Sequence, residues 1–192
     1  MNAIELLFDF FEDHLKAAAA VRARRPLALG SLCFALGALS FYVATAVSGR
    51  LDPLPFGLIT LTLLLLWELA MGFVLTAVLH LIAEMEGRQG SAAELFVLFG
   101  MANLIWGLAI PLVMVFMSVL PRPHWPVTAV FLIVGFFNLS LKARSLQDTY
   151  QVSSGRAWVT LILPYLATLM ASGLALSLAM ASLFIGLMKA LN

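Results

Sequence analysis

Charge is scarce in this sequence. Asp, Glu, Lys and Arg make up 11% of the 192 residues, and most of them fall between long apolar stretches rather than inside them. With 62% hydrophobic residues and a mean hydropathy of +1.02, the chain is far more apolar than a soluble domain. The net charge of +1 lacks the basic footprint of a protein that binds nucleic acid. The sequence therefore predicts a protein whose main partner is the lipid bilayer, with no nucleic acid.

Residues for catalysis or metal binding are also scarce. The single cysteine, Cys33, cannot form an intrachain disulfide. The three histidines, His14, His80 and His124, lack the close spacing of a zinc site. No glycine-rich phosphate loop is present, and no Ser/His/Asp or Cys/His arrangement can be recognised. We therefore predict no catalytic residue, no metal and no cofactor, and a protein that is not an enzyme.

What is abundant is long, continuous apolar sequence. A helix needs about 20 apolar residues to cross a bilayer, whereas barrel strands would read as alternating stretches of about ten. The runs here are continuous, so helices are expected. The sequence predicts an all-α, polytopic helical membrane bundle over 26–192, with five transmembrane helices at about 27–47, 56–82, 95–120, 125–141 and 157–188. Short breaks are expected at 49–53 and 121–124, and a longer polar connection at 142–155.

Two local features of these spans leave alternatives open. Ser91 is a candidate N-cap for the third span, with Glu94 three residues later as in a capping box. The segment 157–191 would be about 52 Å long as one helix, which is too long for a single span. It is expected to bend, tilt strongly or end in an interfacial stretch, and two half-spans in a hairpin are the alternative.

The segment 1–25 is expected to form a separate N-terminal amphipathic interfacial helix, over about 2–20, followed by a basic stretch. Its apolar residues recur at helical spacing, and they are Ile4, Leu7, Phe8, Phe11 and Leu15. Its charged residues fall on the opposite side, and they are Glu5, Asp9, Glu12, Asp13 and Lys16. Such a helix can lie in the membrane interface or dock on the bundle or a partner, and both possibilities stay open.

Lys and Arg predict the orientation, because cytoplasmic segments carry most of them. With a cytoplasmic N-terminus and five spans, eight of these residues fall on the cytoplasmic side and three on the far side. The N-terminus is therefore expected inside and the C-terminus on the far side.

Glu68 is an ionisable residue near the centre of a predicted span, where charge is costly. It shares one helical ridge with Thr76 and His80. It could handle a proton or a substrate, or it could be a neutral acid hydrogen-bonded to a neighbouring helix. We favour the structural role, because no basic residue is expected at the same depth.

Other polar and small residues predict helix contacts and kinks. Gly100, Asn103 and Gly107 share a face of the third span and could line a cavity, but more simply allow close helix packing. Asn138 predicts an interhelical hydrogen bond. Pro111 and Pro164 predict kinks, because proline cannot bond to the carbonyl four residues back. The last span carries a small-residue packing face, expected to pack internally or in a homo-oligomer, formed by Ala167, Ala171, Ala175 and Ala179.

One stretch before the last span carries a family resemblance. Ser153, Ser154, Gly155 and Arg156 precede Ala157, and Leu163-Pro164 follows within the apolar run. Together with Glu94-Leu95-Phe96, Gly100 and Pro111 in the third span, this resembles the bacterial branch of the Yip (Ypt-interacting protein) domain family.

The resemblance implies a non-enzymatic five-span protein of the bacterial inner membrane. The Asp-Leu-Tyr-Gly-Pro motif of the eukaryotic members is absent, which argues against binding of small GTPases. We expect a membrane scaffold that binds another membrane protein or forms a homo-oligomer. The alternative is a small transporter, channel or lipid-moving protein that uses Glu68 and the kinked third span. A cavity that converges on Glu68, Asn103 and Gly107 would favour transport, and a filled centre would favour the scaffold.

Overall fold

The computed structural model describes residues 2–50, 57–120 and 124–191, and these residues form helices and short connections with no strand among them. Five of the helices are long and apolar enough to cross a membrane. The predicted all-α membrane bundle is confirmed. The expected turn residues 51–53 and 121–123 lie outside the described residues.

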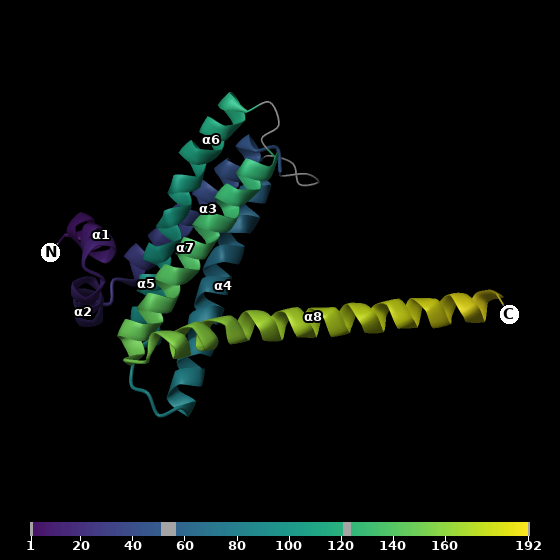
Figure 1. The fold of residues 1–192 in the computed structure, drawn as a ribbon. Helices are drawn as coiled ribbons and strands as arrows, with labels where there is room; N and C mark the ends of the chain where they lie inside the picture. The colour runs from purple at the N-terminus through teal and green to yellow at the C-terminus, as the bar shows by residue number, and fades with distance from the viewer. Residues whose placement is uncertain (1, 51–56, 121–123, 192) are drawn as a thin grey trace.

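Four of the five candidate spans form the bundle in Figure 1. The first is α3 (Leu27–Val47), and the second is α4 (Leu58–Met85). The third consists of α5 (Ala92–Asn103), the 3₁₀ segment η1 (Leu104–Leu108) and α6 (Ala109–Val119). The fourth is α7 (His124–Tyr150). We call the end of the bundle where α3 begins and α4 and α7 end the α2 end, and the opposite end the α6 end.

The fourth span is longer than the sequence suggested. The polar connection predicted at 142–155 is helical as far as Tyr150, and Gln151 ends the helix with a positive φ of 53°. The polar residues of this part of α7 bind the N-terminal helices, which explains why a polar stretch remains helical. Lys142 therefore lies inside a membrane-spanning helix.

Glycines allow α3 to pack closely on its neighbours. A Cβ added to Gly37 would lie 2.6 Å from the Asn103 backbone oxygen, and one added to Gly30 would lie 2.9 Å from Val97 Cα. Gly100 of α5 packs against Gly30. Small residues at such contacts let helix backbones approach in lipid, where van der Waals packing drives association.

The N-terminal segment forms two helices instead of the single helix expected over 2–20. Helix α1 (Ala3–Glu12) begins with a capping box between Asn2 and Glu5. Asp13 ends α1, and its side chain accepts a hydrogen bond from the Lys16 N–H to start α2 (His14–Arg24). An aspartate that interrupts helical hydrogen bonding and caps the next helix explains the break.

Opposite faces of α1 and α2 make different contacts. Leu6, Phe10 and Val21 are buried in an apolar cluster that includes Cys33 and Met101 of the bundle. Of the apolar residues recognised in the sequence, Leu7 is half-buried and packs against this cluster, whereas the other four are exposed: Ile4, Phe8, Phe11 and Leu15. One face docks on the bundle while the other is free to meet the membrane interface.

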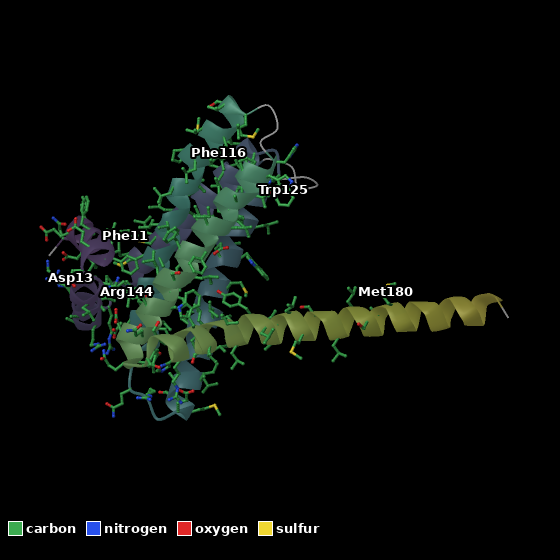
Figure 2. The ribbon with its side chains drawn as sticks, in the orientation of Figure 1. Phe11, Asp13, Phe116, Trp125, Arg144 and Met180 are labelled. Carbon is green, nitrogen blue, oxygen red and sulfur yellow. The ribbon has the colours of Figure 1, made fainter. Side chains whose placement is uncertain are left out.

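Helix α8 (Ser154–Leu191) is one continuous helix and crosses the bundle steeply before leaving it, as Figure 1 shows. The two-piece hairpin is therefore excluded. Ala157 and Leu161 pack against Leu79 and Leu146 in the core. Farther along, α8 extends beyond the other spans, and the labelled Met180 lies well outside them (Figure 2).

Candidate functional site

A large cavity lies between α4 and α7, and we call it the α4–α7 cavity. Its volume is about 1030 Å³, and residues of α5, η1 and the first half of α8 complete its walls. That volume is at the upper end of the roughly 300–1,000 Å³ typical of ligand pockets. Most of the lining is apolar, with Trp67, Phe99, Phe136 and Tyr165 among the large side chains.

Besides Thr168, whose hydroxyl donates to the Pro164 carbonyl of its own helix, four polar side chains interrupt this apolar lining. Glu68, Asn103 and Asn138 were singled out from the sequence, and Lys142 was not. The Asn138 Nδ2 donates to Asn103 Oδ1 at 3.0 Å and to the Ala102 carbonyl at 3.1 Å, which joins α7 to α5. These amides are nearly fully buried, so the bonds keep their polar atoms satisfied in an apolar setting.

Glu68 and Lys142 bring opposite charges to the same cavity, although the sequence had not predicted a basic residue near Glu68. The ammonium of Lys142 lies 5.8 Å from the centre of the Phe99 ring, a cation–π distance. Within the described part of the chain, neither charge makes a hydrogen bond or an ion pair. The expected hydrogen bond from Glu68 to another helix is thus not found.

Other predicted site residues lie apart from the cavity. Thr76 is buried and donates to the Gly72 carbonyl at 2.9 Å, so it serves its own helix. Gly107 lies near Ser40 instead of in the lining. It belongs to η1, four residues before Pro111, where the third span changes from α to 3₁₀ geometry.

The predicted residues of α8 divide between the cavity and the surface. Pro164 and Ala167 line the cavity, and the helix continues through Pro164. Ala167, Ala171 and Ala179 are exposed, so of the two arrangements expected for the small-residue face, packing inside this chain is not found for these three residues. The side chain of Ala175 lies outside what the structure describes.

The family-like motif lies at the α7–α8 connection. Ser153, Ser154 and Gly155 are exposed, and Ser154 begins α8. Arg156 forms an ion pair with Glu86 of the α4–α5 connection, with 3.0 Å between Nε and Oε2. The arginine therefore ties two connections together at the α2 end of the bundle.

A second polar group, which we call the docking cluster, fixes α2 to α5 and α7. It consists of His14, Arg22, Glu94, Ser145 and Asp148. His14 Nδ1 lies 2.6 Å from Asp148 Oδ2, and its Nε2 lies 3.2 Å from Ser145 Oγ. Burial lowers the pKa of His14, and the hydrogen bond to Asp148 only partly offsets this.

Arg22 contributes the other half of the docking cluster. Its Nε and a terminal nitrogen donate to the Glu94 carboxylate at 3.1 Å each, and it also donates to the Asp148 carbonyl at 3.3 Å. The contact with Glu94 raises the pKa of Arg22. Glu94 is only 1% exposed, and it binds Arg22 while Ser91, at the N-cap position, makes no side-chain cap.

The order Ser145–His14–Asp148 matches the connectivity of a hydrolase triad. This arrangement could not be recognised in the sequence, because His14 is more than 130 residues away from the other two, and only the i, i+3 spacing of Ser145 and Asp148 was visible. All three side chains are buried, and the Ser145 hydroxyl donates to the Leu141 carbonyl of its own helix at 2.8 Å. With no path for a substrate to reach Ser145, this arrangement holds helices together.

His80 lies apart from the docking cluster, and its Nε2 is 3.3 Å from Glu84 Oε1. In the described ranges, no group of three His, Cys, Asp or Glu side chains is arranged to hold a metal ion. His80 Nδ1 instead bonds the Tyr150 hydroxyl at 2.8 Å, which links α4 to the end of α7.

Comparison with known proteins gives no relative: no family model matches the chain, and neither the curated proteins nor the solved structures contain a match. What the fold establishes is an integral membrane protein with five apolar helices in contact with lipid.

Proposed function

We propose that this chain is a non-enzymatic membrane protein that binds a lipid-like, amphipathic molecule in the α4–α7 cavity and moves or holds it within the bilayer. The observation that supports this proposal is the joint presence of Glu68, Lys142 and an apolar wall around one large cavity. Ionisable residues inside a membrane are costly and are characteristic of sites for substrates or ions.

The cavity also bears on the choice between the two functions considered from the sequence. A filled centre would favour a scaffold, and a cavity that includes Glu68 and Asn103 favours the transport class. Gly107 is outside the lining, and the third span contributes Phe99, Asn103 and Trp106. An apolar wall suits an acyl chain better than a hydrated ion, which is why we place a lipid ahead of an ion or a polar solute.

A reconstituted system tests this function. Proteoliposomes with a fluorescent phospholipid in both leaflets would be treated with dithionite, which quenches the outer leaflet only. We expect the wild-type protein to allow quenching of the inner leaflet and Glu68→Gln to lose this activity. Glu84→Gln, on the same helix but outside the cavity lining, is the matched control and should behave as wild type. No exchange by the wild type, or equal loss in both variants, would contradict the proposal.

A scaffold remains the second candidate, and one observation favours it. Helix α8 leaves the bundle with exposed apolar residues such as Leu169, Leu174 and Met180. An apolar helix of this kind can pack against another membrane protein or a second copy. This agrees with the resemblance to the bacterial Yip-domain branch and with a place in the bacterial inner membrane, N-terminus inside. Capture of a defined partner that depends on residues of α8, without any lipid exchange, would favour it.

A further inference from the structure

The charged residues of the cavity face it from different helices and at slightly different heights. His80 of α4 and Tyr150 of α7 are hydrogen-bonded, so they lie at the same height along the bundle. Both helices run in the same direction, so residues can be counted back from this height along each of them. Glu68 precedes His80 by twelve residues, and Lys142 precedes Tyr150 by eight. With a rise of about 1.5 Å per residue, Glu68 lies about 6 Å farther from the α2 end than Lys142.

These two charges do not neutralise each other by contact. An ion pair would require a nitrogen–oxygen distance within 4 Å, and none joins Lys142 to Glu68. A cation and an anion that face one apolar space without touching leave both groups with unused hydrogen-bonding capacity, which is costly in a medium of low dielectric.

A ligand with both charges would satisfy this arrangement. The Lys142 ammonium can donate charge-assisted hydrogen bonds to a phosphate, and the Glu68 carboxylate can accept them from a primary ammonium group. A quaternary ammonium has no N–H to donate, and a headgroup without an amine leaves Glu68 unmatched. The apolar walls beside these charges can receive acyl chains.

We propose that the α4–α7 cavity selects a zwitterionic phospholipid whose headgroup carries a primary amine, with the phosphate at Lys142 and the ammonium at Glu68. This inference rests on the proposed function, because it names the class of lipid that the cavity binds.

Lipid binding to the purified full chain in detergent tests the selection. Phosphatidylethanolamine, phosphatidylcholine and phosphatidylglycerol with identical acyl chains would compete in equal amounts, and bound lipid would be counted by native mass spectrometry. We expect phosphatidylethanolamine to be retained about tenfold over each competitor, the factor expected of one charge-assisted hydrogen bond.

Variants separate the two contacts. Glu68→Gln should lose the preference for phosphatidylethanolamine over phosphatidylcholine, while Lys142→Gln should weaken binding of all three phospholipids. Glu84→Gln and Lys16→Gln serve as matched controls and should keep the wild-type pattern. The headgroup preference of the wild-type protein tests the proposal by itself, so a variant that fails to fold does not prevent a conclusion.

The outcomes distinguish the two proposals. Lipid bound with no headgroup preference, or with a preference that survives Glu68→Gln, overturns the headgroup assignment and leaves the proposed function standing. No bound lipid overturns both.

A competing occupant of the cavity is the distal half of α8, from the same or a second copy. A disulfide between Leu132→Cys and Leu174→Cys in a Cys33→Ala background would place that helix there and also overturn both proposals.

Discussion

Single residues decide how the N-terminal helices are held. Arg22 neutralises Glu94, whose carboxylate has almost no contact with solvent, and His14 is enclosed between Asp148 and Ser145. A buried charge that loses its partner is more destabilising than the intact pair is stabilising. The docking of α2 is therefore sensitive to substitutions at these few positions.

Arg22→Ala should lower the free energy of unfolding by about 2–3 kcal/mol, because it leaves the Glu94 carboxylate buried and unpaired. Equilibrium unfolding in mixed micelles, followed by circular dichroism, would measure this change. Lys16→Ala removes the exposed pair with Asp9 and should have little effect. Equal losses in the two variants would contradict the importance of the buried contact.

The docking of α2 should weaken in acid. Because the pKa of His14 is lowered in the docked state, the undocked state binds more protons between that pKa and the usual value near 6.5. The stabilisation is complete above about pH 6.5 and is lost as the pH falls through this range. Hydrogen exchange of residues 14–24 at pH 8 and pH 5, corrected for intrinsic rates, would show it as lost protection.

The His14→Gln variant is the control for this pH effect. Glutamine does not titrate, so the difference in protection between pH 8 and pH 5 should shrink. A variant that keeps the full wild-type difference would show that His14 does not cause it.

At the level of helices, the length and apolarity of the runs were enough to predict five spans. The first predicted span, 27–47, coincides with α3, and the second differs from α4 by only a few residues at each end. The end of α7 could not be predicted, because its polar residues look like a connection in the sequence and their contacts with α2 are not visible there. The break at Asp13 was missed for a related reason: helical periodicity continues across it.

The close contact of α3 with α5 should not tolerate a larger residue. Gly37→Ala would place a methyl group 2.6 Å from the Asn103 carbonyl oxygen, and backbone atoms cannot move away cheaply. We expect a loss of about 1–3 kcal/mol in stability, as for overpacked cores. Thermal unfolding in detergent would measure it. Gly173→Ala meets no atom within 4 Å and should be neutral or slightly stabilising.

The candidate site as a whole was only partly predictable. Glu68, Asn103 and Asn138 could be identified because polar residues stand out in apolar runs. Lys142 was assigned to a connection. Only the packing of α4 and α7 shows that it faces the same cavity as Glu68. The docking cluster depends on contacts between residues more than 70 positions apart, and nothing in local sequence indicates them.

For the whole molecule, the distribution of Lys and Arg predicts which end of the bundle faces the cytoplasm. Arg50 and Gln89 belong to connections at opposite ends, as the path of the chain in Figure 1 shows. In a Cys33→Ala background, an impermeant maleimide applied to intact cells should label Arg50→Cys, and should label Gln89→Cys only after lysis. The reverse pattern would invert the topology, and labelling of both from outside would contradict a spanning bundle.

The apolar cluster beneath α1 and α2 has one more consequence. Cys33 is the chain's one thiol, and the N-terminal helices pack over the cluster that contains it. The rate at which Cys33 is alkylated therefore reports how often α1 and α2 undock from the bundle. Without any engineered label, a thiol reagent can time that opening in the unmodified protein.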